Sequence, residues 1–397
     1  MFAPYSQKRK QGGILRIINV LKYGEDHRFV PGEICMDERN GRFRKNALPG
    51  EPVIDGKGAY AIPGLIDMHF HGCMGDDLCD AGEETLMRMA AYEAENGVTT
   101  ICPATMSVPE ENLHQIMKAA SSYAKKPRRD ACARFAGIHM EGPFINRKKK
   151  GAQAAENIRP CDLALFLGLQ KEAGGLIRLV DLAPETEGAM EFIDAVKAQV
   201  TVSLAHTDSD YATAMEAFSH GASHVTHLFN AMPDFHHRNP GVIGAAADTK
   251  DCRVELICDG IHVHPAAVRA AFLLFGEERI IFISDSMRAA GLSDGIYTLG
   301  GQRVSVHGKR ALLSDGTIAG SVTNLMDGMK NAITEMHIPL EAAIACATEN
   351  PAKELGIFDC CGSITPGKYA DLVLLDETFN LQSVYLGGKE KGDWELQ

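Results

Sequence analysis

Several features that mark other classes of protein are missing from this sequence of 397 residues. No apolar run approaches the roughly 20 residues that a membrane-spanning helix needs. The N-terminal stretch MFAPYSQKRKQGG has no apolar region of the kind found in signal peptides. The formal net charge is -12, so no overall basic field exists to hold nucleic acid or an anionic membrane. We therefore expect a cytoplasmic protein with no nucleic-acid or membrane partner.

Paired cysteines and nucleotide-binding motifs are also absent. The 11 cysteines are scattered without a CxxC pair, and the adjacent Cys360 and Cys361 are poorly placed to bond each other. Neither a disulfide framework nor a thiolate zinc site is predicted. No GxGxxG or P-loop motif appears where a nucleotide-binding fold would need one. Hydrophobic residues make up 45% of the chain, which is enough for one large core and a smaller appended unit.

Both ends of the chain have the pattern of short strands separated by turns. Apolar positions alternate, with Gly or Pro between the runs, in ILRIINVLKY, VPGEICMDE, EPVIDGKGAYAIPG and GSITPGKYADLVLLDETFNLQSVYLGG. Such alternation is typical of strands with one buried face. We predict that residues 1–61 and 357–397 together form one small β-sandwich domain.

Residues 62–356 repeat a different pattern, in which an apolar strand is followed by a loop and an amphipathic helix. The strand candidates are GLIDMHFH, VTTICPAT, FAGIHMEG, LIRLVDLAPE, QVTVSLAHTD, SHVTHLFNA, RVELICDGIH and RIIFISDS. Helical stretches such as EETLMRMAAYEAENG and DSDYATAMEAFSHG separate them. Eight such units favour a (β/α)8 barrel over an open doubly wound sheet. The predicted fold class is therefore α/β, a TIM-like barrel with the small β domain attached.

Residues that commonly bind metal ions end several of these strands. They are His69, His71, Glu141, His206, His227 and Asp285. A closed parallel barrel gathers the C-terminal ends of its strands around one pocket, so residues far apart in sequence can converge there. The spacing of His69 and His71 puts both imidazoles on one face of a strand end, where they can chelate one ion. The pattern suggests a metal-dependent hydrolase.

Each of these residues taken alone also has a structural explanation. An isolated Glu141 would be a helix cap or a surface carboxylate, and Asp285 would be the N-cap of the segment that follows it. His224 lies three positions before His227, on the opposite face of the strand, so we expect it to pack in the core. His139 lies one layer below Glu141, where it is expected to support a ligand rather than to be one.

Longer motifs carry a specific resemblance. Between Pro63 and Asp376, the segments PGLIDMHFHG, HMEGPFINRKKKGAQ, AHTDSDY, THLFNAMPDFHHRNPG, CDGIHVHP, SDSMRAAG and GKYADLVLLD together resemble the amidohydrolase superfamily. Within it they are most similar to deacetylases of phosphorylated amino sugars. The resemblance implies hydrolysis of N-acetylglucosamine 6-phosphate to glucosamine 6-phosphate and acetate.

The resemblance also implies which residues hold metal. Glu141, His206 and His227 would bind one divalent ion, and His69 and His71 would bind a second ion that Glu141 bridges. Some members replace both histidines of the HxH motif and use a single ion, whereas this chain keeps both. Two ions are therefore favoured over one, and these ligands suit zinc, iron, cobalt or manganese.

Asp285 is implied to be the general base and acid. A metal ion lowers the pKa of bound water toward about 7, so that hydroxide is available at neutral pH. Asp285 would take the proton of that water during attack on the amide and return it to the departing amine. His262 would polarise the acetyl carbonyl or hold a sugar hydroxyl, whereas His264 is expected to serve the structure of its loop.

The loop NAMPDFHHRNPG after His227 is implied to bind the phosphate. His237 and Arg238 would supply charge, and Asn230 and the amide of Ala231 would supply neutral donors. Such a loop can reach into a neighbouring subunit's site, so we expect a homodimer. Without the resemblance, the HHR segment would be interpreted as a solvated loop.

Further sugar contacts are implied for Ala152, Ile318, Ala319 and Gly320, largely through backbone atoms. Gln153 departs from the histidine that some relatives have at this position. The basic run 147–150 is expected to be a solvated loop rather than a second phosphate clamp.

Two other functions stay open at this point. A related amidohydrolase, such as an N-acetylgalactosamine-6-phosphate deacetylase or a deaminase, would keep the metal ligands and change the sugar contacts. A non-catalytic scaffold on the same barrel usually loses ligands, and here none of the set is missing.

Overall fold

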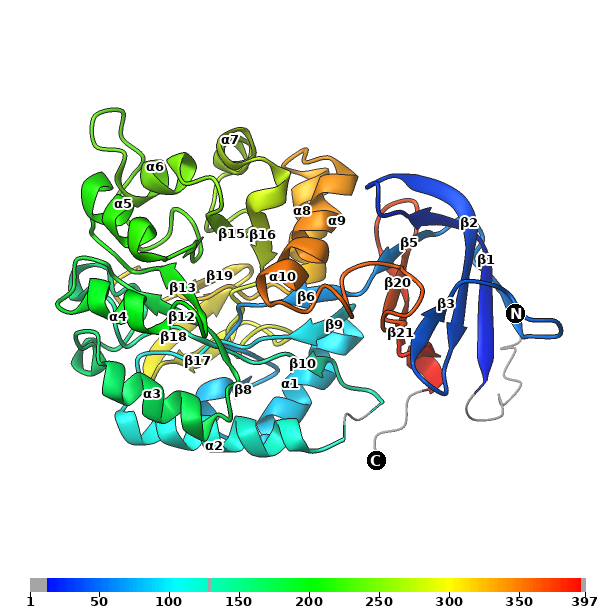
Figure 1. Ribbon diagram of the computed structural model, residues 1–397, viewed down its shortest axis with the longest axis horizontal. Coiled ribbons are helices and arrows are strands. Elements are labelled where there is room, and N and C mark those ends of the chain that lie inside the picture. The colour runs from blue at the N-terminus through cyan, green and yellow to red at the C-terminus, as the bar shows by residue number, and fades with distance from the viewer. Residues whose placement is uncertain (1–12, 128–129, 394–397) are drawn as a thin grey trace.

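Parallel strands and helices alternate along the middle of the chain and form the barrel on the left of Figure 1. The computed structural model describes residues 13–127 and 130–393. The barrel strands are β6 (Leu65–Asp67), β9 (Val98–Ile101), β11 (Ile138–Met140), β12 (Ile177–Leu182), β13 (Thr201–Leu204), β14 (His224–Val225), β15 (Arg253–Ile257) and β16 (Ile280–Ile283), and the short β10 (Arg134–Phe135) pairs with β9. Their apolar residues are buried on both faces, as is typical of parallel sheets.

The barrel closes between its first and last strands. Strands β11 to β16 pair in chain order, β6 pairs with β9, and a parallel bridge beyond the end of β9 joins the two groups. On the other side, the N–H of Asp285 donates to the carbonyl of His69 at 2.9 Å. The N–H of His71 donates to the carbonyl of Ser286 at 2.7 Å. The predicted α/β barrel is confirmed.

Amphipathic helices cover the outside of the barrel. Helix α2 buries Leu113, Ile116, Met117 and Ala120, whose spacing places them on one face. The helices are α1 (Glu83–Glu95), α2 (Glu110–Lys125), α3 (Leu163–Glu172), α4 (Ala189–Val196), α5 (Tyr211–His220), α6 (Gly241–Asp248), α7 (Pro265–Phe275), α8 (Leu325–Thr334), α9 (Leu340–Ala347) and α10 (Glu349–Glu354). Short 3-10 turns are η1 (Leu78–Asp80), η2 (Arg147–Lys149), η3 (Ala155–Asn157), η4 (Glu277–Arg279) and η5 (Lys391–Asp393).

Two small antiparallel units are added to the barrel. One is the hairpin of β7 (Gly72–Cys73) and β8 (Asp76–Asp77). The other is a meander of β17 (Gly295–Leu299), β18 (Gln302–His307) and β19 (Arg310–Leu312), inserted between β16 and α8. No strands were predicted from the sequence for the meander. It leads directly into the turn at 317–320, which lines the cavity described below.

The two ends of the chain share one sheet, seen as the blue and red strands on the right of Figure 1. Its strands are β1 (Ile14–Tyr23), β2 (Phe29–Asp37), β3 (Arg42–Arg44), β4 (Val53–Asp55), β5 (Tyr60–Pro63), β20 (Leu372–Leu375), β21 (Leu381–Leu386) and β22 (Lys389–Glu390). Strand β20 pairs antiparallel with β5, which joins the two ends as expected. The sheet encloses its own apolar core, which includes Leu15, Ile34 and Tyr385. Residues 1–12 of the expected N-terminal segment lie outside the described part.

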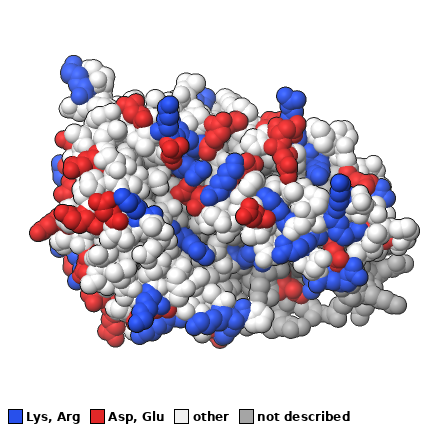
Figure 2. Space-filling view, in the orientation of Figure 1, with Lys and Arg blue, Asp and Glu red and all other residues white. Residues whose placement is uncertain are grey.

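The surface has mixed charge on the face shown in Figure 2. Acidic and basic side chains are interspersed there, in keeping with the absence of a single basic field in the sequence. Among the described helices, none has the length and apolar character needed to span a bilayer.

Candidate metal centre and active site

The C-terminal ends of the barrel strands surround one cavity of about 360 Å³. That volume lies within the range of small-molecule sites, about 300–1,000 Å³. Of the residues expected at the site, it is lined by His71, Ala152, Glu141, His206, His227, Asn230, Ala231, His262, Asp285, Ile318, Ala319 and Gly320. His69 lies beneath the cavity floor and is fully buried.

Left-handed backbone turns three of the expected residues toward this cavity. The φ angles are 45° at His206, 32° at His227 and 46° at Asp285, each just beyond the end of its strand. Non-glycine residues rarely adopt this conformation, which costs about 1–3 kcal/mol and tends to occur at functional sites. At Asp285 the turn is held by backbone hydrogen bonds to His69 and from the N–H of Ser321.

Glu141, His206 and His227 converge on one point. The Nε2 atoms of both histidines lie 3.0 Å from Glu141 Oε1 and 3.2 Å from each other. Metal bonds of about 2.0–2.2 Å at tetrahedral angles would place ligand atoms about 3.4 Å apart. The backbone carbonyl of Lys149, 2.8 Å from His206 Nδ1, accepts from that nitrogen and leaves Nε2 as the metal-facing atom. This set therefore fits a divalent ion with little movement.

His69, His71 and Asp285 form a second set next to the first. His71 Nε2 lies 3.3 Å from Asp285 Oδ1 and 3.3 Å from Glu141 Oε2. His69 Nε2 lies 3.7 Å from the same Asp285 oxygen. It is buried and has no hydrogen-bond partner among the described residues. An orphaned nitrogen facing two carboxylates fits a second ion, and Glu141 lies between the two sets.

The buried carboxylates and imidazoles shift each other's pKa values. Burial alone would lower the pKa of His71, but the Asp285 and Glu141 carboxylates raise it to about 9. Burial alone would likewise lower the pKa of His227, and Glu141 raises it to about 9. Burial would raise the pKa of Asp285, but the imidazoles of His71 and His69 hold it below its ordinary value. Asp285 is therefore ionised at neutral pH, and a bound cation would displace protons from the imidazoles.

Gln153 holds the metal-facing carboxylate in place. Its amide nitrogen donates to Glu141 Oε2 at 2.7 Å, and its oxygen accepts from the N–H of Ser107 at 2.5 Å. Gln153 is 1% exposed. From the sequence, Gln153 was expected near the sugar and differed from some relatives only by replacing a histidine. A glutamine two residues after a glycine turn gives no sequence signal for this contact.

Two lysines of the run 147–150 line the cavity, and Lys148 is also 72% exposed, so the run is solvated as expected but folded into a turn beside the site. Residues Arg147–Lys149 form η2, capped by the Asn146 side chain, and this turn brings Lys148 and Lys149 to the cavity wall. The Lys149 amino group donates to the carbonyl of Met232 at 3.2 Å. A run of four basic residues is the same in a free loop and in a folded turn, so the sequence could not separate these cases.

His237 and Arg238 are not brought to this cavity. Both are exposed, and Arg238 lines a separate hollow with Tyr211 and Asn239. His262 does line the cavity, but its Nε2 donates to the carbonyl of Ala319 at 2.9 Å while its Nδ1 faces Asp259 at 2.7 Å. In this structure His262 therefore supports the 317–320 turn.

The three other histidines that the sequence analysis placed outside the ligand sets lie away from the cavity. His139 Nε2 donates to Asp181 at 2.8 Å beneath the ligands. His224 is buried between the carboxylates of Glu255 and Glu354. His264 caps α7 by accepting from a backbone N–H.

Comparison with known protein families shows the family to which this chain belongs. Residues 60–391 match the sequence model of the Amidohydrolase family. This chain belongs to the amidohydrolase family. The family is metal-dependent, and the described residues of this member include both convergent sets as groups that could hold a metal ion.

Named relatives of this amidohydrolase act on phosphorylated amino sugars. It is 45% identical over 316 residues to the N-acetylglucosamine-6-phosphate deacetylase of Bacillus subtilis, covering 79% of this chain and 80% of the relative. It is 35% identical to the N-acetylgalactosamine-6-phosphate deacetylase of Escherichia coli O157:H7, covering 82% and 86%. A mutant of the Mycobacterium smegmatis N-acetyl-D-glucosamine-6-phosphate deacetylase, solved in complex with N-acetyl-D-glucosamine-6-phosphate, superposes with a TM-score of 0.87 at 28% identity, covering 96% of this chain and 100% of that chain.

We expect Glu141→Ala and His206→Ala to lose most of the divalent metal that the wild-type amidohydrolase carries, because each removes a converging ligand atom. His220→Ala is the matched control, since His220 bonds Asp194 on the outside of the barrel. Metal-to-protein ratios of the purified variants would be measured by plasma emission spectroscopy. Wild-type metal content in His206→Ala would show that the convergence is not a metal site.

Proposed function

We propose that this amidohydrolase removes the acetyl group from N-acetylglucosamine 6-phosphate, giving glucosamine 6-phosphate and acetate. The observation that carries the proposal is the convergence of Glu141, His206 and His227 at the floor of a cavity whose wall carries Lys149. Such a site can activate water for attack on an amide without a nucleophilic side chain. The named deacetylase relatives support the choice of amide and sugar.

Two divalent ions are the proposed cofactors. Glu141, His206 and His227 would hold one, His69 and His71 would hold the other, and Glu141 would face both. Imidazole and carboxylate ligands suit zinc, iron, cobalt or manganese. When bound, such an ion supplies water of lowered pKa and polarises the acetyl carbonyl.

Asp285 is the proposed general base and acid. Its ionised carboxylate lines the cavity next to both ligand sets, so it can accept the proton of the attacking water. The same carboxyl group then returns that proton to the departing amine nitrogen. Backbone hydrogen bonds to the carbonyl of His69 and from the N–H of Ser321 hold Asp285 in this position.

The phosphate is proposed to bind at the mouth of the cavity. Lys149 supplies charge on the wall of the same chain, and Asn230 and Ala231 line the cavity beside it. Arg238 and His237 are exposed and do not line this cavity, so we propose that they complete the site of a partner chain in a homodimer. An arginine fork on a phosphate would then join the two subunits.

Deacetylation of N-acetylgalactosamine 6-phosphate is a second candidate, favoured by the 35% identity to the Escherichia coli enzyme. The two sugars differ at one ring hydroxyl, so the same ligands and phosphate contacts would serve both. The turn at 317–320 and Ala152 are the elements proposed to contact the sugar ring.

The division into domains and the compartment also belong to this proposal. Residues 1–61 and 357–397 would form the small domain, and residues 62–356 the catalytic barrel. All 11 cysteines are free thiols, which supports action in the reducing cytoplasm.

Purified protein is expected to release acetate from N-acetylglucosamine 6-phosphate, to lose this activity on chelation and to regain it with added metal. Initial rates on both phosphorylated epimers would rank the two candidate substrates. No acetate from either sugar, with metal bound, would contradict the proposed function.

We expect Asp285→Asn to retain fold and metal but to lose about 10²–10⁴-fold in kcat, because an amide cannot transfer the proton. Asp248→Asn is the control, since the Asp248 carboxylate only accepts from Tyr211 on the surface. Steady-state kinetics with parallel metal analysis would measure the effect. Near wild-type turnover in metal-loaded Asp285→Asn would refute the proposed role.

We expect Lys149→Ala and Arg238→Ala to reduce kcat/KM for the phosphorylated sugar about ten- to a hundredfold, because a charge-assisted contact contributes about 1.5–3 kcal/mol. The kcat/KM for unphosphorylated N-acetylglucosamine should change much less. Lys250 is exposed, and Lys250→Ala should leave kcat/KM for both sugars unchanged. Equal losses on both sugars would show a structural role.

Mixing Arg238→Ala chains with Asp285→Asn chains tests the shared site. Mixed dimers contain one site with both wild-type residues if the loop crosses, so activity should partly return. No return after confirmed subunit exchange would place Arg238 in the site of its own chain.

A further inference from the structure

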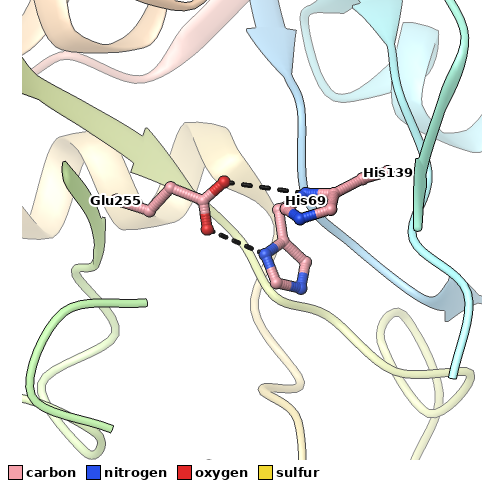
Figure 3. A group of neighbouring side chains, drawn as sticks. All are labelled: His69, His139 and Glu255. Atoms are coloured by element: carbon pink, nitrogen blue, oxygen red, sulfur yellow. Dashed lines mark hydrogen bonds and ion pairs between the residues drawn. The ribbon is translucent and has the colours of Figure 1, made fainter. Parts of the chain in front are cut away.

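The fully buried carboxylate of Glu255 lies directly beneath the two ligand sets. Glu255 belongs to β15, and none of its side chain is exposed. Its Oε2 accepts from His69 Nδ1 at 2.8 Å and from the backbone N–H of His227 at 3.2 Å (Figure 3 shows the contact with His69). One carboxylate therefore contacts a residue of each ligand set.

This contact fixes which nitrogen of His69 carries the proton. An ionised carboxylate only accepts hydrogen bonds, so the proton must lie on Nδ1 and the lone pair on Nε2. Figure 3 shows the second ring nitrogen of His69 pointing away from Glu255. That atom faces Asp285 at 3.7 Å and Glu141 at 3.8 Å, and it has no hydrogen-bond partner in the described part of the chain.

The contact is a hydrogen bond rather than a metal site of its own. His69, His139 and Glu255 lie close enough together to suggest a cation among them. However, His69 Nδ1 donates its proton to Oε2 of Glu255 at 2.8 Å, so this nitrogen has no lone pair for an ion. His139 is also bonded through Nε2 to Asp181 and lies 3.7 Å from Glu255 (Figure 3).

We propose that Glu255 is the positioning residue for the second metal ion, because it fixes the tautomer and the ring orientation of His69. This inference rests on the two-ion centre of the proposed function. A carboxylate behind a ligating histidine also makes the imidazole a better donor, and loss of such a partner lowers metal affinity about 10–100-fold. Glu255 itself touches neither substrate nor the reacting atoms.

The rest of the buried network offers a matched control. Glu255 Oε1 lies 3.3 Å from His224 Nε2, and His224 Nδ1 lies 3.4 Å from Glu354. Glu354 pairs with Arg253 at 2.7 Å, on the side of His224 away from His69. Glu354→Gln therefore removes a buried carboxylate of the same network, one imidazole farther from the ligands.

The experiment is a titration of the full-length protein with Zn²⁺ at buffered free concentrations, which gives one affinity for each ion. Wild type, His69→Ala, Glu255→Gln and Glu354→Gln are compared. We expect Glu255→Gln to weaken the second ion about 10–100-fold and the first by less than about threefold. Glu354→Gln should change neither. Retention of the first ion, whose ligands follow β11, β13 and β14, also shows that the barrel is folded.

The outcomes separate the two proposals. Wild-type affinity for both ions in Glu255→Gln would overturn the inference, and so would an equal loss in Glu354→Gln. One ion in the wild type, unchanged in His69→Ala, would overturn the two-ion centre and the inference with it. If Glu255→Gln fails to fold, Glu255→Asp keeps the charge but shortens the reach, and an unchanged second affinity in that variant would also refute the proposal.

Discussion

The pairing of the first barrel strand with the last determines the geometry of the whole site. The backbone of His69 accepts from Asp285, and the backbone of His71 donates to Ser286. Three of these four residues, His69, His71 and Asp285, are also the residues of the second proposed ligand set. Their relative positions follow from backbone hydrogen bonds, whose lengths vary little. A small change in barrel closure would therefore displace His71 and Asp285 together.

Charge balance inside the barrel is the second constraint. Glu141, Asp285 and Glu255 lie in an apolar interior, where an unpaired carboxylate would cost several kcal/mol. Burial would raise the pKa of Glu255, but His69 and the other surrounding imidazoles hold it well below its ordinary value. Each of these carboxylates contacts imidazoles of the proposed ligand sets. The same contacts therefore fix the positions of these side chains and keep the carboxylates ionised.

The strands, the barrel and the convergence of the strand-end residues could be predicted because apolar runs of the right length end in polar residues. Loop geometry could not be predicted in the same way. The positions of Lys149 and Gln153 depend on the turns between β11 and α3, which leave no periodic pattern. The meander at 295–312 was missed because its short strands are half exposed and alternate weakly.

Two site residues differ in what the sequence could have revealed. Glu255 lies inside the apolar run RVELIC. A carboxylate within a buried strand predicts a buried hydrogen-bond or ionic partner, because an unpaired buried charge is costly. Glu255 does not end its strand, however, so the strand-end pattern that marks the other site residues does not include it. Arg238 is the opposite case, because the contact proposed for it in a partner chain would leave no trace in the packing of its own chain.

The sheet that joins the chain ends has a consequence for the order of folding during synthesis. Strand β20 covers the edge of β5, and the carbonyl of Asp371 accepts from the N–H of Gly64, the residue between β5 and β6. A ribosome produces β20 only after the entire barrel has been translated. Until then one edge of β5 is unpaired. The hydrogen bond from Gly64 to Asp371, just before β6 and the His69–His71 segment, is also not yet formed. Because contacts between distant parts of a chain form slowly, we expect the pairing of β5 with β20 to complete this sheet late in folding.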